Sequence, residues 1–371
     1  MKLDAKSTIE AGKAILGIEF GSTRIKAVLI DQENKPIAQG SHTWENQLVD
    51  GLWTYSVEAI WYGLQDCYAD LRSNVKKLYD IEIEALAAIG VSAMMHGYMA
   101  FNDKEEILVP FRTWRNTNTG QAAAALSELF VYNIPLRWSI SHLYQAILDN
   151  EEHVKDINYL TTLAGFIHWQ ITGKKVLGIG DASGMLPIDP VTKNYSAEMV
   201  AKFDGLIAPK GYNWKLLEIL PKVLPAGENA GFLTPEGAKM LDVSGHLKAG
   251  IPVCPPEGDA GTERRHHPHE QGQRDEPDND KGDEAVAEKR EARVDEHFCN
   301  GSASLARHLR DEVGDLREHA DDADDDENQR HVVRKPGEDE LAVDYAVLEG
   351  DAPRVDLAPG EYAAHAVPHL S

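Results

Sequence analysis

The sequence has little cysteine, a shortage of basic residues and no long hydrophobic run. Its three cysteines, Cys67, Cys254 and Cys299, are widely spaced and form no CxxC pair, which argues against a disulfide framework. No apolar run approaches the length of a helix that spans a bilayer. The first residues, "MKLDAKSTIEAGK", lack the hydrophobic core of a signal peptide. We therefore expect a protein of the reducing cytoplasm with no membrane partner.

The charge balance excludes one class of partner. The chain carries 37 lysines and arginines against 61 acids, a net charge of −24. Nucleic-acid binding requires a basic face that neutralises phosphates, so we expect no nucleic-acid partner. A length of 371 residues is enough for two or three domains.

The composition changes abruptly at Thr262. Residues 263–371 hold 30 of the 61 acids, 14 of the 37 basic residues and nine of the 15 histidines, but no Trp, Ile, Met or Thr. Such a segment buries too little apolar surface to offset chain entropy, so one interpretation is a disordered acidic tail. The other is a GC-rich gene read out of frame. We therefore divide the chain into an N-terminal extension (1–13), a globular domain (14–262) and an acidic tail (263–371).

The pattern of apolar residues in the globular domain predicts an α/β fold. Two β-rich runs flank a Gly-Ser-Thr turn and predict a hairpin, and a helix of period 3.6 follows Ser56 as its N-cap. The expected strands are 15–20, 25–31, 36–44, 86–93 and 98–101. The clearest later helices are 119–130, 141–148 and 160–173. We expect a mixed sheet covered by helices on its faces.

The turn in "GIEFGSTRIKAVLID" (17–31) is the first candidate site. Gly21, Ser22 and Thr23 offer main-chain N–H groups and two hydroxyls, the donors that a phosphate oxygen needs. Glu19, on the preceding strand, could hold Mg²⁺ directly or through water. A plain hairpin turn is the alternative.

Two further stretches could bind a polyol. In "VSAMMHGYMAF" (91–101), His96 and a glycine break a buried strand and place an imidazole at a strand end; a core histidine is the alternative. In "FRTWRNTNT" (111–119), the ring of Trp114 could stack on a sugar while Arg115 and Asn116 bind its hydroxyls. A surface turn before a helix is the alternative there.

The stretch "PPEGDAGT" (255–262) places Asp259 between small residues, where the backbone can approach a ligand closely. Such a carboxylate can take the proton from a hydroxyl as its oxygen attacks phosphorus. The alternative is an aspartate in an ordinary turn.

Taken together, in this order, these motifs resemble the FGGY-type carbohydrate kinases of the actin/Hsp70/hexokinase superfamily, over nearly all of residues 14–262. The stretches "ILPKVLPAGENAGFLTPEGAKM" (219–240) and "GIPVCPPEGDAGT" (250–262) resemble the same family, closest to its ribulokinase- and xylulokinase-like branch. The resemblance implies an RNase H-like domain that binds a sugar and uses ATP and Mg²⁺. It implies these roles: Asp259 as general base; Gly21, Ser22, Thr23, Gly258 and Gly261 toward the nucleotide; Met95, His96, Trp114, Arg115 and Asn116 around the sugar; Glu19 toward the metal.

The sequence also departs from this family. Glu19 stands where an aspartate is usual, and Arg115-Asn116 replaces the usual Asn-Asp, so the sugar need not be a usual ketopentose. Residues 263–371 contain no second Gly-Thr-Ser phosphate loop. We therefore expect a truncated kinase of little or no activity, or alternatively a non-catalytic sugar sensor. The oligomeric state stays open, with a homodimer among the alternatives.

Other motifs are weaker. "GKKVLGIGDASG" (173–184) is a near miss for a dinucleotide-binding fingerprint, because Ser183 occupies the third glycine position. The sequence has no GxxxxGK[ST] loop, which excludes a P-loop NTPase. "HHPHE" (266–270) with His297 could bind Zn²⁺ or Ni²⁺, against the alternative of an accidental cluster.

Overall fold

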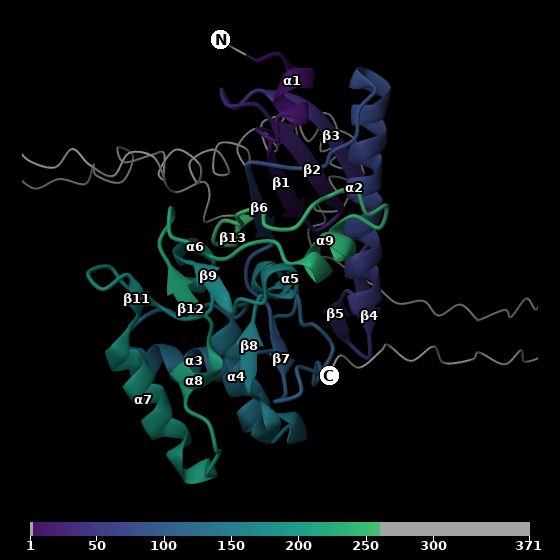
Figure 1. The fold of residues 1–371 in the computed structure, drawn as a ribbon. Coiled ribbons are helices and arrows are strands. Elements are labelled where there is room, and N and C mark those ends of the chain that lie inside the picture. Colours follow the sequence, from purple (N-terminus) through teal and green to yellow (C-terminus); the bar gives the residue numbers. More distant parts are fainter. Residues whose placement is uncertain (1–2, 260–371) are drawn as a thin grey trace, which may run out of the picture. The chain divides into compact units, whose positions relative to one another are not determined.

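A five-stranded mixed sheet organises the computed structural model, which describes residues 3–259 (Figure 1). The strand order is β13-β6-β1-β2-β3. The strands are β1 (Ile15–Phe20), β2 (Arg24–Ile30), β3 (Pro36–Thr43), β6 (Ala88–Ala93) and β13 (Glu257–Gly258). β1, β2 and β3 pair antiparallel, whereas β6 runs parallel to β1 and β13 runs parallel to β6. The predicted α/β class with a mixed sheet is confirmed.

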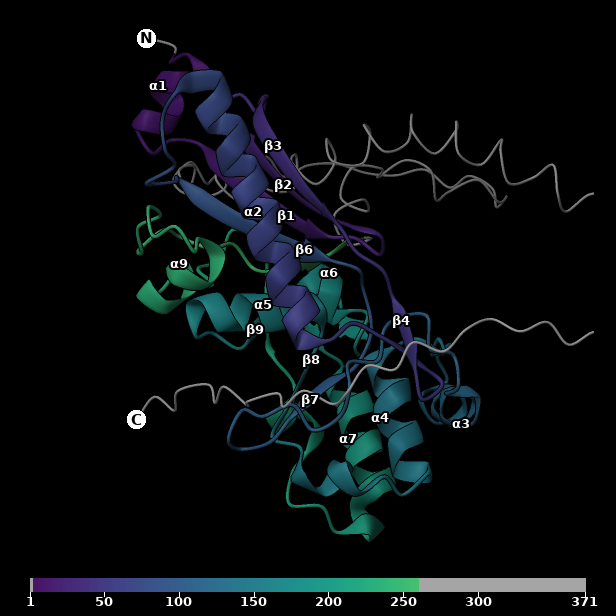
Figure 2. The same ribbon diagram turned by 90° about the vertical axis from the view of Figure 1, so that its right-hand side faces the viewer.

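The long helix α2 (Val57–Tyr79) lies lengthwise along the sheet (Figure 2). It begins as predicted, because the Ser56 hydroxyl accepts a hydrogen bond from the main-chain N–H of Ala59 at 3.1 Å. The backbone of β3 comes so close to α2 that a Cβ added at Gly40 would collide with the main chain of Leu71. Glycine at this position therefore sets the distance between helix and sheet.

The core around the sheet also includes α5 (Leu163–Thr172) and α9 (Pro235–Leu241). α5 contributes Phe166 and Trp169, two aromatic rings with centroids 6.3 Å apart, and α9 packs on α5 where Gly237 meets the carbonyl of Ile171. The expected helix over 160–173 starts later than predicted. Its first residues belong to β8 (Tyr159–Thr161), which pairs antiparallel with β7 (Met99–Phe101).

A second hydrophobic core forms from the long segment between β6 and β13. It contains α3 (Gly120–Phe130), α4 (Ser139–Leu148) and α7 (Ala197–Ile207), which lie together below the sheet in Figure 1. The remaining elements are α1 (Ala5–Glu10), β4 (Gln47–Val49), β5 (Leu52–Thr54), the 3₁₀ helix η1 (Glu152–Asp156), β9 (Val176–Gly178), α6 (Ile179–Ala182), β10 (Ile188–Asp189), β11 (Asn194–Tyr195), the 3₁₀ helix η2 (Ala208–Lys210), α8 (Leu216–Ile219) and β12 (Lys222–Leu224).

Within residues 3–259, no helix is both long and apolar enough to cross a membrane. Cys67 and Cys254 are both buried free thiols. Several expectations fall outside the described residues: Gly261, Cys299, the His-rich stretch at 266–270 with His297, and the acidic tail.

Candidate active site

The parallel pairing of β6 with β13 brings two of the predicted motifs together. Ser92 lies opposite Glu257 and Ala93 opposite Gly258, so both strands end at the same edge of the sheet. Just beyond that edge, the main-chain N–H of Met95 donates to Asp259 Oδ1 at 3.1 Å. The residues that follow β6, which are candidates for sugar binding, are therefore in direct contact with Asp259, the candidate general base.

Gly258 makes this contact possible. A Cβ added at Gly258 would collide with the Met95 side chain and would lie 3.2 Å from Asp181 Oδ1. A larger residue would force the Met95 side chain or the end of β13 to shift, and would disturb the contact between Met95 and Asp259.

His96 lies in a strained turn at the end of β6. Its φ is 69°, in the left-handed region that costs a non-glycine residue about 1–2 kcal/mol, and Gly97 follows with φ 96°. The Ser139 hydroxyl fixes the turn by donating to the Gly97 carbonyl at 2.6 Å. Such strain tends to occur at functional sites, where the surrounding structure maintains it.

The imidazole of His96 is mostly enclosed. Its Nδ1 lies 3.4 Å from the carbonyl oxygen of Gly184. Burial lowers the pKa of His96, and the nearby charge of Arg137 lowers it further, so the ring is neutral at physiological pH. With Nδ1–H directed at the carbonyl, Nε2 is the nitrogen that could accept a hydrogen bond from a ligand.

The Gly-Ser-Thr turn is held in place through its carbonyl groups. The Gly21 carbonyl accepts from Trp44 Nε1 at 2.8 Å, the Ser22 carbonyl from the Tyr55 hydroxyl at 2.5 Å, and the Thr23 carbonyl from the Trp44 N–H at 3.1 Å. Within the described part of the chain, the main-chain N–H groups of Ser22 and Thr23 donate to no acceptor. These two donors suit an anion such as a phosphate oxygen.

Trp114 connects the Gly-Ser-Thr turn to the segment 111–119, which the sequence marks as a candidate polyol-binding segment. Its Nε1 donates to Ser22 Oγ at 3.2 Å. Arg115 lies with its guanidinium 3.8 Å from the ring centroid of Trp53, and Arg137 lies 5.7 Å from the Trp114 ring. Each of these two tryptophan rings therefore has one guanidinium group beside it, and the Trp114 ring adjoins the turn through its bond to Ser22.

Asn116 occupies a different position from its two neighbours. It is 4% exposed, and its Oδ1 accepts from the Trp53 N–H at 2.9 Å. Its Nδ2 donates to the carbonyl oxygens of Trp53 and Thr113 at 2.8 and 3.0 Å. The amide is thus bonded on both sides to main chain, and it tethers the segment to β5.

Glu19 lies in β1, two residues before the Gly-Ser-Thr turn. Lys26 and Ser92 lie opposite it in the neighbouring strands β2 and β6. Among residues 3–259, no group of three or more His, Cys, Asp or Glu side chains is arranged to hold a metal ion. Mg²⁺ usually needs only one or two protein carboxylates, with waters and nucleotide phosphates as the other ligands. A single carboxylate such as Glu19 is compatible with that requirement.

Sequence reasoning missed Asp181, a carboxyl group beneath the site. It is 1% exposed, and its Oδ2 accepts from the Thr162 hydroxyl at 2.6 Å. Its main-chain N–H donates to Glu257 Oε2 at 3.1 Å, while Oδ1 has no hydrogen-bond partner within the described residues. Burial, with the charges of Glu257 and Asp259, raises the pKa of Asp181 to about 8, so this carboxyl group is protonated at neutral pH.

The glycine pattern around Asp181 now has a structural reason that is unrelated to dinucleotide binding. A Cβ at Gly178 would collide with the Glu257 carboxylate, and one at Gly184 would lie 2.7 Å from His96 Nδ1. The stretch "GIGDASG" therefore lines the back of the candidate site, where its small residues allow β13 and the His96 turn to approach.

A second buried histidine lies close by. His142, on α4, is fully buried, and neither ring nitrogen has a hydrogen-bond partner within the described residues. Burial, with the charge of Arg112, lowers the pKa of His142 to about 3, so the ring is neutral. Neither His142 nor Asp181 stands in a motif that marks it from sequence.

Comparison with known proteins shows the family of this domain. The model of the FGGY family of carbohydrate kinases, N-terminal domain, matches residues 14–261. The xylulose kinase of Escherichia coli (strain K12) is 20% identical over 251 residues, which cover 66% of this chain and 48% of that enzyme. The L-fuculokinase of Salmonella typhi is 22% identical over 258 residues, 66% of this chain and 50% of that enzyme. The chain thus spans about half the length of the curated relatives it matches.

Solved structures show the same fold at low identity. The ligand-bound xylulose kinase from Lactobacillus acidophilus is 19% identical with a TM-score of 0.56, over 67% of this chain and 49% of that one. Plasmodium falciparum glycerol kinase with ADP is 16% identical with a TM-score of 0.53, over 67% of this chain and 49% of that one.

Proposed function

The chain belongs to the FGGY family of carbohydrate kinases, and from that premise we propose that residues 14–262 form the sugar-binding domain of an ATP-dependent sugar kinase. The observation that carries the proposal is the hydrogen bond from the Met95 N–H to Asp259 Oδ1 at 3.1 Å. It fixes a carboxylate at the edge of the sheet where the His96 turn and the Gly-Ser-Thr turn also lie. A general base must be held within reach of the proton it removes, and this contact supplies that orientation.

Asp259 acts as the general base in this proposal. It takes the proton from a sugar hydroxyl as that oxygen forms a bond to the γ-phosphorus of ATP, and the bond from the γ-phosphorus to the β–γ bridging oxygen breaks, leaving ADP. The Met95 N–H donates to Oδ1, which helps to orient the carboxylate toward a substrate hydroxyl. Phosphoryl transfer depends mainly on such positioning and on charge stabilisation.

The main-chain N–H groups of Ser22 and Thr23 bind the transferring phosphate in this proposal, with Gly21, Gly258 and Gly261 leaving room for the nucleotide. Glu19 holds Mg²⁺ directly or through water. When bound, the ion neutralises charge that develops on the phosphate oxygens.

Met95, His96, Trp114 and Arg115 form the sugar pocket. The neutral His96 accepts from a sugar hydroxyl through Nε2, while the Trp114 ring stacks on the carbon–hydrogen face of the sugar. Asn116 contributes by holding this segment to β5, since its amide groups are bonded to main chain. The ligand is a ketose or polyol, in keeping with relatives named for xylulose, L-fuculose and glycerol.

The proposal includes low turnover. It rests on residues 263–371, which contain no second Gly-Thr-Ser loop to bind the triphosphate. It also includes a cytoplasmic location, which the buried free thiols of Cys67 and Cys254 support.

A coupled ADP-release assay with a panel of pentuloses and hexuloses, joined to calorimetric titration of each sugar, tests the proposal. We expect one or more sugars to bind and turnover far below the rate of about 1–100 per second typical of kinases. Absence of binding by every ketose and polyol would overturn the sugar-binding assignment. Turnover at ordinary kinase rates would overturn the low-turnover part alone.

A further inference from the structure

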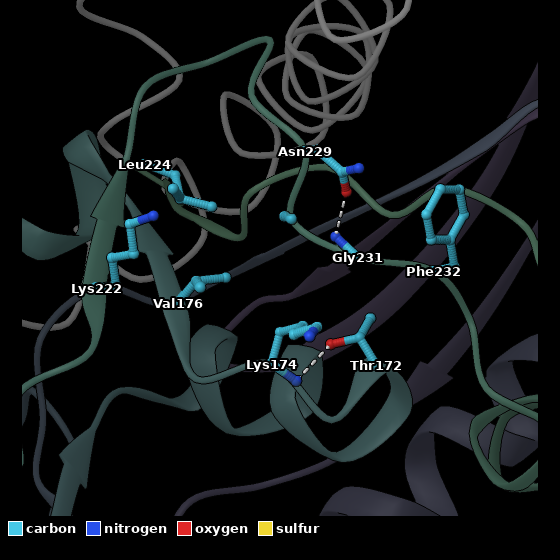
Figure 3. Close-up of a pocket in the computed structure, with 9 residues that line it drawn as sticks. Thr172, Lys174, Val176, Lys222, Leu224, Asn229, Gly231 and Phe232 are labelled. Atoms are coloured by element: carbon cyan, nitrogen blue, oxygen red, sulfur yellow. Dashed lines mark hydrogen bonds between the residues drawn. The ribbon is translucent and has the colours of Figure 1, made fainter.

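A separate pocket of about 700 Å³ lies on the two-stranded sheet of β9 and β12, apart from the residues of the proposed active site (Figure 3). Its size falls within the range of small-molecule sites, about 300–1,000 Å³. The lining residues are Thr172, Lys174, Val176, Lys222, Leu224, Asn229, Ala230, Gly231 and Phe232.

The register of the two strands explains which side chains share the pocket. β12 pairs parallel with β9, and Lys222 lies opposite Val176. Residues two apart in an extended chain face the same way, so Lys174 and Val176 point to one side, as do Lys222 and Leu224. The sheet therefore presents two aliphatic side chains as a floor and two ammonium groups beside them.

Both lysines lack a counter-charge in the part of the chain that the structure describes. Within residues 3–259, neither Lys174 nor Lys222 makes a salt bridge, and the pocket lining contains no Asp or Glu. The adjacent Lys175 differs, because its ammonium group pairs with Glu105 at 3.1 Å and lies 4.6 Å from the ring centroid of Trp169. Two unpaired cations in a pocket of a chain with a net charge of −24 favour an anionic ligand.

The loop over the pocket supplies a third donor. Asn229 Oδ1 accepts from the Gly231 N–H at 2.8 Å, which leaves Nδ2 directed away from that contact in Figure 3. Gly231 has φ 110°, and a Cβ there would lie 2.9 Å from Lys174 Cγ. The loop thus packs on the stem of Lys174 in a way that glycine alone permits. Buried His168 anchors the loop, its Nε2 lying 3.0 Å from the Ala230 carbonyl.

Phe232 forms the apolar rim. Its side chain is 51% exposed, and Figure 3 places its ring across the pocket from Lys222. An exposed aromatic ring beside an aliphatic floor suits a flat apolar group.

We propose that this pocket, formed by Lys174, Lys222, Asn229 and Phe232, binds a small aryl or heteroaryl phosphomonoester. The phosphate carries close to two negative charges at neutral pH and matches the two ammonium groups and the amide donor. The ring lies on Val176 and Leu224 and against Phe232. This site is independent of the proposed kinase chemistry.

Phenyl phosphate is the probe, titrated into the full chain by calorimetry or ligand-observed NMR, with benzoate and inorganic phosphate as comparisons. We expect Lys174→Met and Lys222→Met each to weaken phenyl phosphate binding about tenfold, since each removes a charge-assisted contact. The matched control, Lys155→Met, changes an exposed lysine on η1 and leaves the affinity unchanged.

Two further sets of titrations test which class of ligand binds and whether it binds in this pocket. Phe232→Ala weakens phenyl phosphate about threefold and leaves inorganic phosphate unchanged, and benzoate binds about tenfold more weakly than phenyl phosphate. Asp259→Asn leaves phenyl phosphate binding unchanged, which separates this site from the proposed active site. Equal affinity of the wild type and the Lys174→Met/Lys222→Met double variant would overturn the proposal, and equal affinity of benzoate and phenyl phosphate would overturn the assignment to a dianion.

Discussion

The main-chain N–H of Met95 and the carboxylate of Asp259, 164 positions apart in the sequence, are joined by a hydrogen bond of 3.1 Å. Because β6 and β13 are parallel neighbours, this bond ties the strand end that carries His96 to the strand end that carries the proposed base. A displacement of one motif therefore displaces the other. The His96 turn and the proposed base move as one unit.

Asp259→Asn tests the role of this carboxylate directly. The amide keeps the size of the side chain and can accept from Met95, but it cannot take a proton from a sugar hydroxyl. We expect any sugar-dependent ADP release to fall at least a hundredfold, the lower range for general-base catalysis, about 10²–10⁴. Calorimetric sugar affinity should stay within about threefold of the wild type. Undiminished turnover in the variant would contradict the assignment, and unchanged binding without turnover in either protein would favour a sugar sensor.

Asp181 makes the stability of the domain depend on pH. In the folded chain burial raises the pKa of Asp181 to about 8, whereas the unfolded chain has an ordinary value of about 3.9. Between about pH 4 and about pH 8, the folded state therefore keeps a proton on Asp181 that the unfolded state has already lost. Its contribution to stability is fully present below the unfolded pKa and is lost as the pH rises through the folded pKa, with a slope of up to about 1.4 kcal/mol per pH unit.

Asp181→Asn should remove this dependence, because an amide stays neutral at every pH and can still accept from Thr162. Urea unfolding between about pH 5 and about pH 8 measures the free energy of unfolding of both proteins. We expect the wild type to lose stability relative to the variant as the pH rises. Asp103→Asn, at an exposed position, is the control and should follow the wild type. Parallel pH profiles for the wild type and Asp181→Asn would contradict a proton on Asp181.

Gly184→Ala should displace His96. The new methyl would lie 2.7 Å from His96 Nδ1 and 3.1 Å from Met95 Cε, so the ring and the methionine must shift. We expect sugar affinity to fall about tenfold, since the pocket loses both the position of the imidazole and its contact with the Gly184 carbonyl. Titration of the best-bound sugar measures the effect. Gly205→Ala, in α7 with nothing within 4 Å, is the control; it should leave affinity unchanged and raise stability by about 0.5–1 kcal/mol.

The hairpin, α2 and β6 could be predicted because their signals are local. The alternation of apolar residues in a strand and their period in a helix involve only a few neighbouring residues. The N-cap bond from the Ala59 N–H to Ser56 likewise joins residues three positions apart. The start of α5 could not, because Leu160 and Thr161 join β8 through pairing with Met99 and Ala100, far away in the sequence. Tertiary pairing outweighed helix propensity there.

The candidate site shows the same division. The Gly-Ser-Thr turn and Asp259 stand out because small residues surround them in the sequence. Asp181 does not, since its burial and its contact with Glu257 exist only once β13 lies beside α6. The family resemblance predicted which residues form the candidate site, but the hydrogen bonds among them could be described only from the fold.

Asn116 gives the last prediction, because the sequence departs there from the family's usual aspartate. Asn116→Asp restores the carboxylate but loses the Nδ2 donor, so the buried carbonyl oxygens of Trp53 and Thr113 would face negative charge instead of an N–H. Leaving two buried acceptors unpaired costs about 3 kcal/mol, and we expect the free energy of unfolding to fall by about that amount near neutral pH and to recover partly in acid as the new carboxyl group protonates. Chemical denaturation at both conditions measures it, with Asn158→Asp, an exposed site, as the control expected to stay within about 0.5 kcal/mol. If Asn116→Asp were as stable as the wild type while sugar affinity rose, the amide would not be the tether to β5, and position 116 would belong among the residues that contact the sugar.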